Sequence, residues 1–391
     1  MASDISDICI IGTGHTRFGR LDDNLETLIV TASREALHEA GLSGDAIDAI
    51  FISHFNSGLV RDSFVSSLVL QTDPGLRFKP STRVENACAS GTAAIHAGMA
   101  AILAGQAKRV LVVGAEKMTS RSTPEVTEAL AGAGYQNNPA EAALSFPGVF
   151  ALAAQAYGER HGDPLPAMAQ IASKNHMNAM ANPLAHMRRP MTVADCATIG
   201  DRNPVVAPPL RLTDCSLVSD GAAALVLTST DLAQGHEHVA RFRAAVQVND
   251  LLPMSLRDLA AFEGPARAIR RAYSEAGIGV DDLGFAEVHD CFTIAELMIY
   301  EAMGLAEAGN GAEAIASGRV LREGRTPVNL SGGLKAKGHP IGATGVSMHV
   351  MAFRQLTGNA GEIQAPNPRA GLVFNMGGVA VANYASILSS C

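Results

Sequence analysis

Residues 39–52, which read EAGLSGDAIDAIFI, return as residues 275–288, which read EAGIGVDDLGFAEV. Each copy predicts the end of a helix with a glycine stop, then a short turn and a buried strand. Because the two copies align residue for residue, the chain is predicted to be doubled. Two like halves would place their equivalent helices together about a pseudo-twofold axis.

A second repeat pairs His96 and Gly105 with His349 and Gly358 at another constant offset. It predicts that the helix ending near Gly105 and the helix ending near Gly358 occupy corresponding positions. Residues just ahead of these two helices are therefore predicted to share one site, although they lie far apart in the sequence.

Cys88 precedes the first of these helices, in residues 86–91, NACASG. A β-prone stretch at 81–84 leads into this small-residue turn, and an apolar helix follows from Thr92. A helix N-terminus carries partial positive charge, so the thiol, with an ordinary pKa of about 8.5, is expected to shift toward thiolate. Taken alone, Cys88 also fits an ordinary buried core cysteine.

His339 precedes the second helix, in residues 332–345, GGLKAKGHPIGATG. It stands between a permissive glycine and a rigid proline, on a turn with more backbone freedom than core packing requires. A cysteine and a histidine on two such close-packed turns indicate a thiol nucleophile with its base.

The length of 391 residues exceeds one ordinary core and favours two halves, residues 1–238 and 239–391. Within the first half, residues from about 119 to 209 are rich in alanine, methionine, asparagine, proline and histidine. We expect a helical, loop-rich insertion there that lies over the N-terminal half, and long insertions of this kind often act as binding lids.

Composition excludes several classes of partner. Hydrophobic residues make up 47% and charged residues 17%, which is typical of an α/β enzyme with a large core. The net charge of −8 comes without a basic cluster, so neither nucleic acid nor an anionic membrane is the expected partner. No stretch predicts a membrane span, and the acidic residues 1–7 do not resemble a secretory signal. Six cysteines without paired spacing favour the cytoplasm.

Weaker signals allow other interpretations. Residues 12–19 follow a strand and approach a dinucleotide-binding loop, but Arg17 stands where the third glycine is needed. Residues 235–238, GHEH, are more typical of a solvated turn than of a metal site. His176 and His186 are interpreted as residues of the insertion.

Four motifs in order resemble the thiolase superfamily, in its sterol-carrier-protein type branch. They are residues 86–91, Asp214 with residues 219–223, residues 289–292 (HDCF), and residues 331–345. The resemblance covers nearly the whole chain. It implies an α/β thiolase fold, five-layered αβαβα from two duplicated halves with a helical loop-domain insertion in the N-terminal half, acting on coenzyme A thioesters.

Residue by residue, the resemblance makes Cys88 the acylated nucleophile and His339 its base. His289 is implied to donate a hydrogen bond to the thioester oxygen of the acyl group that forms the enolate. The backbone N–H groups of Cys88 and Gly377 are implied to form an oxyanion hole.

Cys291 is implied to be the acid/base that moves the α-proton. Many thiolases carry that second cysteine in a C-terminal glycine turn, but here residues 375–378 read NMGG and hold no thiol. The resemblance therefore assigns the role to Cys291 of the HDCF motif.

The resemblance further implies coenzyme A as co-substrate, no tightly bound cofactor, no metal, and a homodimer or homotetramer. The implied reaction is reversible thiolysis of a 3-ketoacyl-CoA through an acyl-Cys88 intermediate. Two rivals stay open: a decarboxylating ketoacyl synthase, and an acyltransferase or aldolase subunit of a thiolase-like complex. Cys291 argues against the synthase, because decarboxylation needs no thiol to abstract a proton.

Overall fold

The two copies of the sequence repeat fold in the same way in the computed structural model, which describes residues 4–391. Both helices stop at a glycine in the left-handed region, Gly41 with φ 64° and Gly277 with φ 66°. A Cβ is strained in that region, so glycine is favoured. The elements are α1 (Leu25–Glu39) and β2 (Ala49–Ser53) in one copy, and α9 (Glu263–Ala276) and β9 (Phe285–Val288) in the other.

The remaining elements fall into three groups along the chain. The first half adds β1 (Ile8–His15), α2 (Val65–Leu68), β3 (Ser81–Val84), α3 (Ser90–Leu103), β4 (Arg109–Glu116) and β7 (Gly221–Ser229). The segment between β4 and β7 forms α4 (Thr123–Ala131), α5 (Pro139–Ala142), α6 (Phe146–His161), α7 (Leu165–Met180), α8 (Val193–Ala197), β5 (Val205–Ala207) and β6 (Leu210–Arg211). The second half adds β8 (Ala240–Asn249), α10 (Thr293–Ala302), α11 (Gly311–Ala316), α12 (Ile341–Leu356), β10 (Ala370–Gly377) and β11 (Ala382–Ser390).

The sheet shows the duplication directly. Its strand order is β3-β2-β4-β7-β1-β8-β11-β10-β9. Read outward from the centre, β1, β7, β4 and β2 correspond to β8, β11, β10 and β9. The counterpart of β3 is reduced to a single parallel bridge between Val328 and Ala286 of β9. The halves join where β1 pairs antiparallel with β8, at Cys9 opposite Arg241 and Ile10 opposite Ala240.

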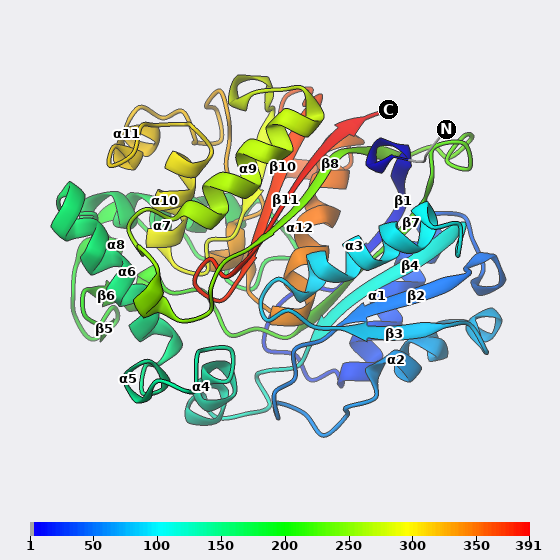
Figure 1. The fold of residues 1–391 in the computed structure, drawn as a ribbon, viewed down its shortest axis with the longest axis horizontal. Coiled ribbons are helices and arrows are strands. Elements are labelled where there is room, and N and C mark those ends of the chain that lie inside the picture. The colour runs from blue at the N-terminus through cyan, green and yellow to red at the C-terminus, as the bar shows by residue number, and fades with distance from the viewer. Residues whose placement is uncertain (1–3) are drawn as a thin grey trace.

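Alternate side chains of each strand face different layers. In β1, Ile8 and Ile10 belong to the core around α3 and α12, whereas Cys9 and Ile11 pack with α1. Helix α12 contacts strands of both halves, and α9 covers β8 and β11 on the face of the second half-sheet that lies away from α12 (Figure 1). The order of layers is α1, first half-sheet, α3 with α12, second half-sheet, α9, which confirms the predicted αβαβα thiolase fold.

Helices α3 and α12 approach each other backbone to backbone. A Cβ added to Gly91 would lie 2.6 Å from the backbone nitrogen of Val346, so glycine is required at this crossing. The predicted correspondence of the two helices is confirmed by their ends, where Gly105 has φ 69° and Gly358 has φ 76°. Because the helices cross near their N-termini, the residues that precede them are brought together.

The position of the insertion corrects one expectation. We expected it over the N-terminal half. Helix α4 does pack there, with Val126 and Ala129 against Phe55 and Leu59, but α7 packs against α10, α11 and the π-helical turn Gly333–Lys337 of the second half. The reason is a buried polar network: Lys174 of α7 pairs with Glu296 of α10 at 2.7 Å, and Asn175 donates to Asp290 at 2.7 Å. The boundary between residues 238 and 239, and the insertion bounds of 119 and 209, remain predictions.

No helix within the described residues is long and apolar enough to cross a membrane. Residues 1–3 of the acidic N-terminal stretch considered for a secretory signal lie outside the described residues.

Candidate active site

Three of the predicted site residues meet at the centre of the molecule. Cys88 lies between β3 and α3, His289 follows β9, and His339 precedes α12. The sulfur of Cys88 and one ring nitrogen of each histidine all lie within 4.8 Å of one another. All three residues are buried, and the two imidazole planes are nearly perpendicular, at 88°.

The turn that carries Cys88 is tight and strained. Ala87 adopts φ 48°, a left-handed conformation that is costly for a residue with a Cβ. Hydrogen bonds hold the turn: the Asn86 N–H donates to Ser90 Oγ at 2.7 Å, and the Ala89 N–H donates to the Asn86 carbonyl at 3.0 Å. Strain retained in this way is common at catalytic turns, and here it projects Cys88 toward the histidines.

The electrostatics of Cys88 correct the expectation of a preformed thiolate. Burial raises the pKa of the thiol to about 12, although the N–H of Gly378, hydrogen-bonded to it, acts in the opposite direction. Loss of hydration therefore outweighs the position at a helix N-terminus. The thiol is protonated at neutral pH, so a neighbouring base must take its proton when it attacks.

The hydrogen bonds of His339 fix its tautomer. Its Nδ1 lies 2.7 Å from Thr344 Oγ1, and that hydroxyl donates its single proton to the Pro340 carbonyl at 3.0 Å. Nδ1 must therefore be the donor to Thr344, which leaves Nε2 as a lone pair. Nε2 is buried and has no hydrogen-bond partner among residues 4–391. Burial and the charge of Lys337 lower the pKa of His339 to about 3, so the ring is neutral at physiological pH and the Nε2 lone pair is unprotonated.

His289 has the opposite tautomer. Its Nδ1 lies 2.9 Å from the side-chain nitrogen of Asn375, which also donates to the Cys88 carbonyl at 3.2 Å. A carbonyl only accepts, so the amide orientation is fixed, and Asn375 Oδ1 accepts from Thr92 at 2.8 Å. Nδ1 of His289 is therefore the acceptor and Nε2 carries the proton. That buried N–H has no partner within the described part of the chain, so it is free to donate to a substrate oxygen.

We predict that Thr344→Val slows acylation of Cys88 by acetyl-CoA about tenfold, the effect of losing one hydrogen bond. Without the Thr344 hydroxyl to accept from the Nδ1–H, the His339 ring can carry its proton on Nε2 instead. Nε2 then has no lone pair with which to take the Cys88 proton. Thr344→Ser keeps the hydroxyl and should retain most of the parental rate. Rapid-quench mass analysis of the acyl-enzyme measures both variants. Equal rates for the two would contradict the tautomer assigned to His339.

Cys291 is buried near this cluster but is not part of it. Burial raises the pKa of its thiol well above the ordinary value, and the charges of Cys88 and Asp290 add to this. Within residues 4–391, however, the group of atoms that lie mutually within 4.8 Å consists of Cys88, His289 and His339.

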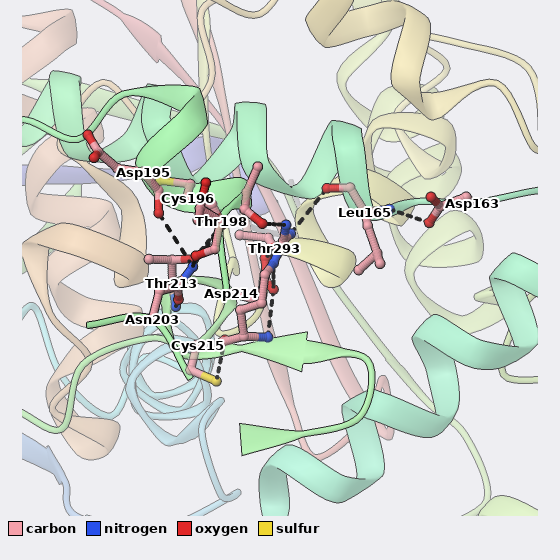
Figure 2. A network of polar contacts seen from close by, with 12 residues as sticks. Asp163, Leu165, Asp195, Cys196, Thr198, Asn203, Thr213, Asp214, Cys215 and Thr293 are labelled. Atoms are coloured by element: carbon pink, nitrogen blue, oxygen red, sulfur yellow. Dashed lines mark hydrogen bonds and ion pairs between the residues drawn. The ribbon is translucent and has the colours of Figure 1, made fainter. Parts of the chain in front are cut away.

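The segment that returns from the insertion is hydrogen-bonded to the first turn of α10 through Asp214 and Thr293 (Figure 2). Asp214 accepts from Arg211 Nε at 2.8 Å and from Thr293 Oγ1, on the first turn of α10, at 2.8 Å. The Ser216 N–H donates to the carbonyl of Cys291 at 2.9 Å. The Asp214 motif therefore anchors α10 and does not face the reacting groups.

The glycine turn after β10 closes the site. A Cβ on Gly377 would lie 2.6 Å from the Asn86 carbonyl, so this turn packs directly on the Cys88 turn. The backbone N–H that hydrogen-bonds the Cys88 sulfur belongs to Gly378, which the sequence analysis missed although the paired glycines mark the turn. The oxyanion hole of Cys88 and Gly377 remains a prediction.

A buried carboxylate that no sequence motif marks supports the His339 turn. Glu116 accepts from the backbone N–H groups of residues 55–56 and from Gly342 N at 2.9 Å, at the start of α12. Burial opposes its ionisation, but the adjacent His54, at 3.0 Å, and these donors hold the pKa of Glu116 below its ordinary value. The ionised carboxylate thus fixes the N-terminus of α12.

The weaker sequence candidates lie outside the site. Gly12 belongs to β1, where a Cβ would lie 2.6 Å from the Ala36 carbonyl, so it permits close packing of α1 and does not form a nucleotide loop. His186 is hydrogen-bonded to Ser219 at 2.8 Å, and His176 is buried in α7.

A cysteine with two histidines is also a ligand set that suits zinc, so the expectation that the site binds no metal stays a prediction.

Comparisons with known proteins decide the family. The family model described as the thiolase N-terminal domain matches residues 8–231, and the thiolase C-terminal domain-like model matches residues 246–390. Acetyl-CoA acetyltransferase from Methanothermobacter thermautotrophicus is 36% identical over 376 residues, which cover 95% of this chain and 96% of that protein. The chain belongs to the thiolase family. It is an acyltransferase enzyme.

Further thiolase relatives agree in fold. Sterol carrier protein 2 from Bos taurus is 29% identical, over 95% of this chain and 70% of that protein. The crystal structure of human mitochondrial 3-ketoacyl-CoA thiolase in complex with CoA matches with a TM-score of 0.74 and 18% identity, covering 99% of this chain and 98% of that one. The structure described as the Ltp2-ChsH2(DUF35) aldolase matches with a TM-score of 0.80 and 22% identity, covering 98% of each chain. These two likenesses show the thiolase fold alone.

Proposed function

We propose that this thiolase catalyses the reversible thiolysis of 3-ketoacyl-CoA, and the reverse Claisen condensation, through an acyl-Cys88 intermediate. The observation that carries the proposal is the pair of opposite tautomers around Cys88. His339 presents a lone pair and His289 presents an N–H, both buried and without partners among residues 4–391. Attack by the thiol needs a base to take its proton, and the enolate that leaves when the carbon–carbon bond breaks needs a donor to its oxygen.

In thiolysis, His339 Nε2 takes the proton of Cys88 as the sulfur attacks the 3-keto carbon. Backbone N–H groups of Cys88 and of the turn at residues 377–378 stabilise the alkoxide. The bond between carbons 2 and 3 then breaks, and its electron pair forms the enolate of acetyl-CoA. His289 Nε2 donates to the enolate oxygen, and the Cys291 thiol protonates its carbon. The proton held by His339 then passes to the Cys291 thiolate, which leaves both groups neutral again. His339 next takes the proton of free coenzyme A as its sulfur attacks the acyl-Cys88 thioester, and returns that proton to Cys88 as the Cys88 sulfur leaves.

In this proposal coenzyme A is a co-substrate, and no cofactor is bound tightly. All six cysteines are free thiols, which supports the assignment to the reducing cytoplasm. The relative named benzoylsuccinyl-CoA thiolase subunit BbsB, from Thauera aromatica and 28% identical, supports a subunit of a larger complex as the alternative.

A thiolysis assay tests the proposal. Acetoacetyl-CoA and coenzyme A should be converted to acetyl-CoA, with two products formed for each acetoacetyl-CoA consumed. Longer 3-ketoacyl-CoAs test the chain-length range. If the isolated chain cleaves none of these substrates, the proposal fails and the partner-dependent alternative becomes the better interpretation.

We predict a homodimer. Strand β3 lies at the edge of the sheet, pairs only with β2 among the described strands, and leads directly into the Cys88 turn. An unpaired edge is a site for pairing with a second copy. Phe64 and Phe78, in the segment before β3, are 75% and 86% exposed and would be covered in the same contact. Sedimentation equilibrium should give the mass of two chains, or of four for a tetramer, where one chain has a mass of 40.6 kDa. A dominant monomer at micromolar concentration would contradict the prediction.

A further inference from the structure

A small cavity lies against the turn that holds the Cys88 sulfur. Its volume is about 30 Å³, and its walls are mostly apolar, with Phe146 and Val149 from α6 and Val379 from the glycine turn. It shares Gly378 with an open cleft of about 550 Å³ that passes along the Cys88 turn. A group bound at Cys88 is therefore next to the entrance of the small cavity.

Arg257 stands in the wall of this cavity with two of its nitrogens unused. Its Nη1 donates to the Val379 carbonyl at 2.6 Å. Its Nε and Nη2 are buried, and neither has a hydrogen-bond partner in the described range, 4–391. A buried donor without a partner costs free energy, and a guanidinium presents its donors in a fork that matches a carboxylate or phosphate.

No carboxylate within residues 4–391 lies at ion-pair distance from Arg257. Asp250 and Glu141 are the acidic neighbours that offset the effect of burial on its pKa. The Glu141 carboxylate also lines the cavity, but it accepts from Met254 N at 2.9 Å and from Ser255 Oγ at 2.9 Å. The guanidinium is thus a positive charge in an apolar wall without a direct counter-ion.

We propose that Arg257 binds a carboxylate at the far end of the acyl group, so that the preferred substrates are short 3-oxo-dicarboxylic acyl-CoAs. This inference rests on the proposed thiolase function. The space of about 30 Å³ is two to three times the roughly 10–15 Å³ that one water molecule needs by the same measure, so it admits a small polar group such as a carboxylate.

The position of Arg257 selects the acyl carboxylate over the phosphates of coenzyme A. Val379, which Arg257 contacts, directly follows Gly378, whose N–H bonds the Cys88 sulfur. The guanidinium is therefore near the acyl carbon that becomes attached to Cys88. The diphosphate of coenzyme A is separated from its sulfur by the whole pantetheine arm and would lie toward the opening of the cleft.

A matched pair of substrates tests the proposal in the intact enzyme. Thiolysis of 3-oxohexanedioyl-CoA gives succinyl-CoA and acetyl-CoA, and 3-oxohexanoyl-CoA is its neutral counterpart of equal length. We expect kcat/KM to favour the dicarboxylic substrate, and Arg257→Gln to lower that preference about ten- to hundredfold, as for a lost charge-assisted hydrogen bond. Arg257→Lys should keep part of the preference. Arg271→Gln, which removes an exposed arginine of α9, should leave it unchanged.

Two further measurements make the outcomes decisive. Should Arg257→Gln fail to fold, succinyl-CoA must still inhibit the parent enzyme more strongly than butyryl-CoA; equal inhibition overturns the proposal. N-acetylcysteamine thioesters of the same acyl groups lack the phosphates. If Arg257→Gln weakens both CoA substrates equally and neither short thioester, Arg257 binds phosphate and the proposal is wrong. A parent enzyme that cleaves the neutral substrate without preferring the dicarboxylic one overturns the inference alone, whereas one that cleaves neither overturns the thiolase function as well.

Discussion

Cys88→Ala is expected to abolish covalent acylation. The variant removes the thiol that lies within 4.8 Å of both histidine nitrogens, while the base on His339 and the donor on His289 remain. No other cysteine in residues 4–391 belongs to that group, so no second thiol lies beside these two histidines. Intact-mass analysis after incubation with acetyl-CoA should show one acetyl adduct on the parent and none on the variant.

The control for this experiment is Cys391→Ala. Cys391 is exposed, and its pKa is lowered to about 7 by a hydrogen bond from Cys9, so it is the thiol most open to acylation without catalysis. Cys391→Ala should keep the full adduct of the parent. An adduct that persists in Cys88→Ala and disappears in Cys391→Ala would overturn the assignment of the nucleophile.

The doubling of the chain and the pair of Cys88 and His339 could be predicted because each depends on local sequence, whereas the five-layered fold and the role of His289 were implied only by the family resemblance. Gly41 and Gly277 end equivalent helices by their own backbone conformation, and the same is true of Gly105 and Gly358. Cys88 and His339 each stand on a turn directly ahead of one of the paired central helices. Doubling of the chain then implied that the two turns meet.

What could not be predicted depends on contacts between distant segments. Asn375 and Thr344 fix the histidine tautomers through hydrogen bonds that no spacing pattern reveals. The pKa of Cys88 depends on how completely the packed site excludes water, and this outweighed the helix position available from sequence. Likewise, α7 of the insertion packs on the second half, where Lys174 has a buried partner in Glu296.

Cys215→Ala serves as the control for the variant Cys291→Ala. The backbones of Cys215 and Phe292 pair in an isolated β-bridge, and burial raises the pKa of the Cys215 thiol to about 12. Cys215→Ala removes a half-buried thiol next to the same motif. It should keep both acylation and α-proton exchange near the parental rates. Loss of exchange in both variants would indicate damage to the packing around α10 and not loss of an acid/base.

Cys291→Ala is expected to separate the two chemical stages of the reaction. Acylation of Cys88 by acetyl-CoA needs only Cys88, His339 and the backbone donors, so the variant should still form the acetyl adduct. Thiolysis and α-proton exchange of acetyl-CoA in D2O should fall by roughly a hundred- to ten-thousandfold, as for removal of a general acid or base. His289→Ala should show the same division, because its N–H is needed most where the enolate charge develops. If Cys291→Ala exchanges the α-proton as fast as the parent, Cys291 is a structural thiol. A decarboxylating condensation, which needs no such proton transfer, would then explain the one cysteine and two histidines better.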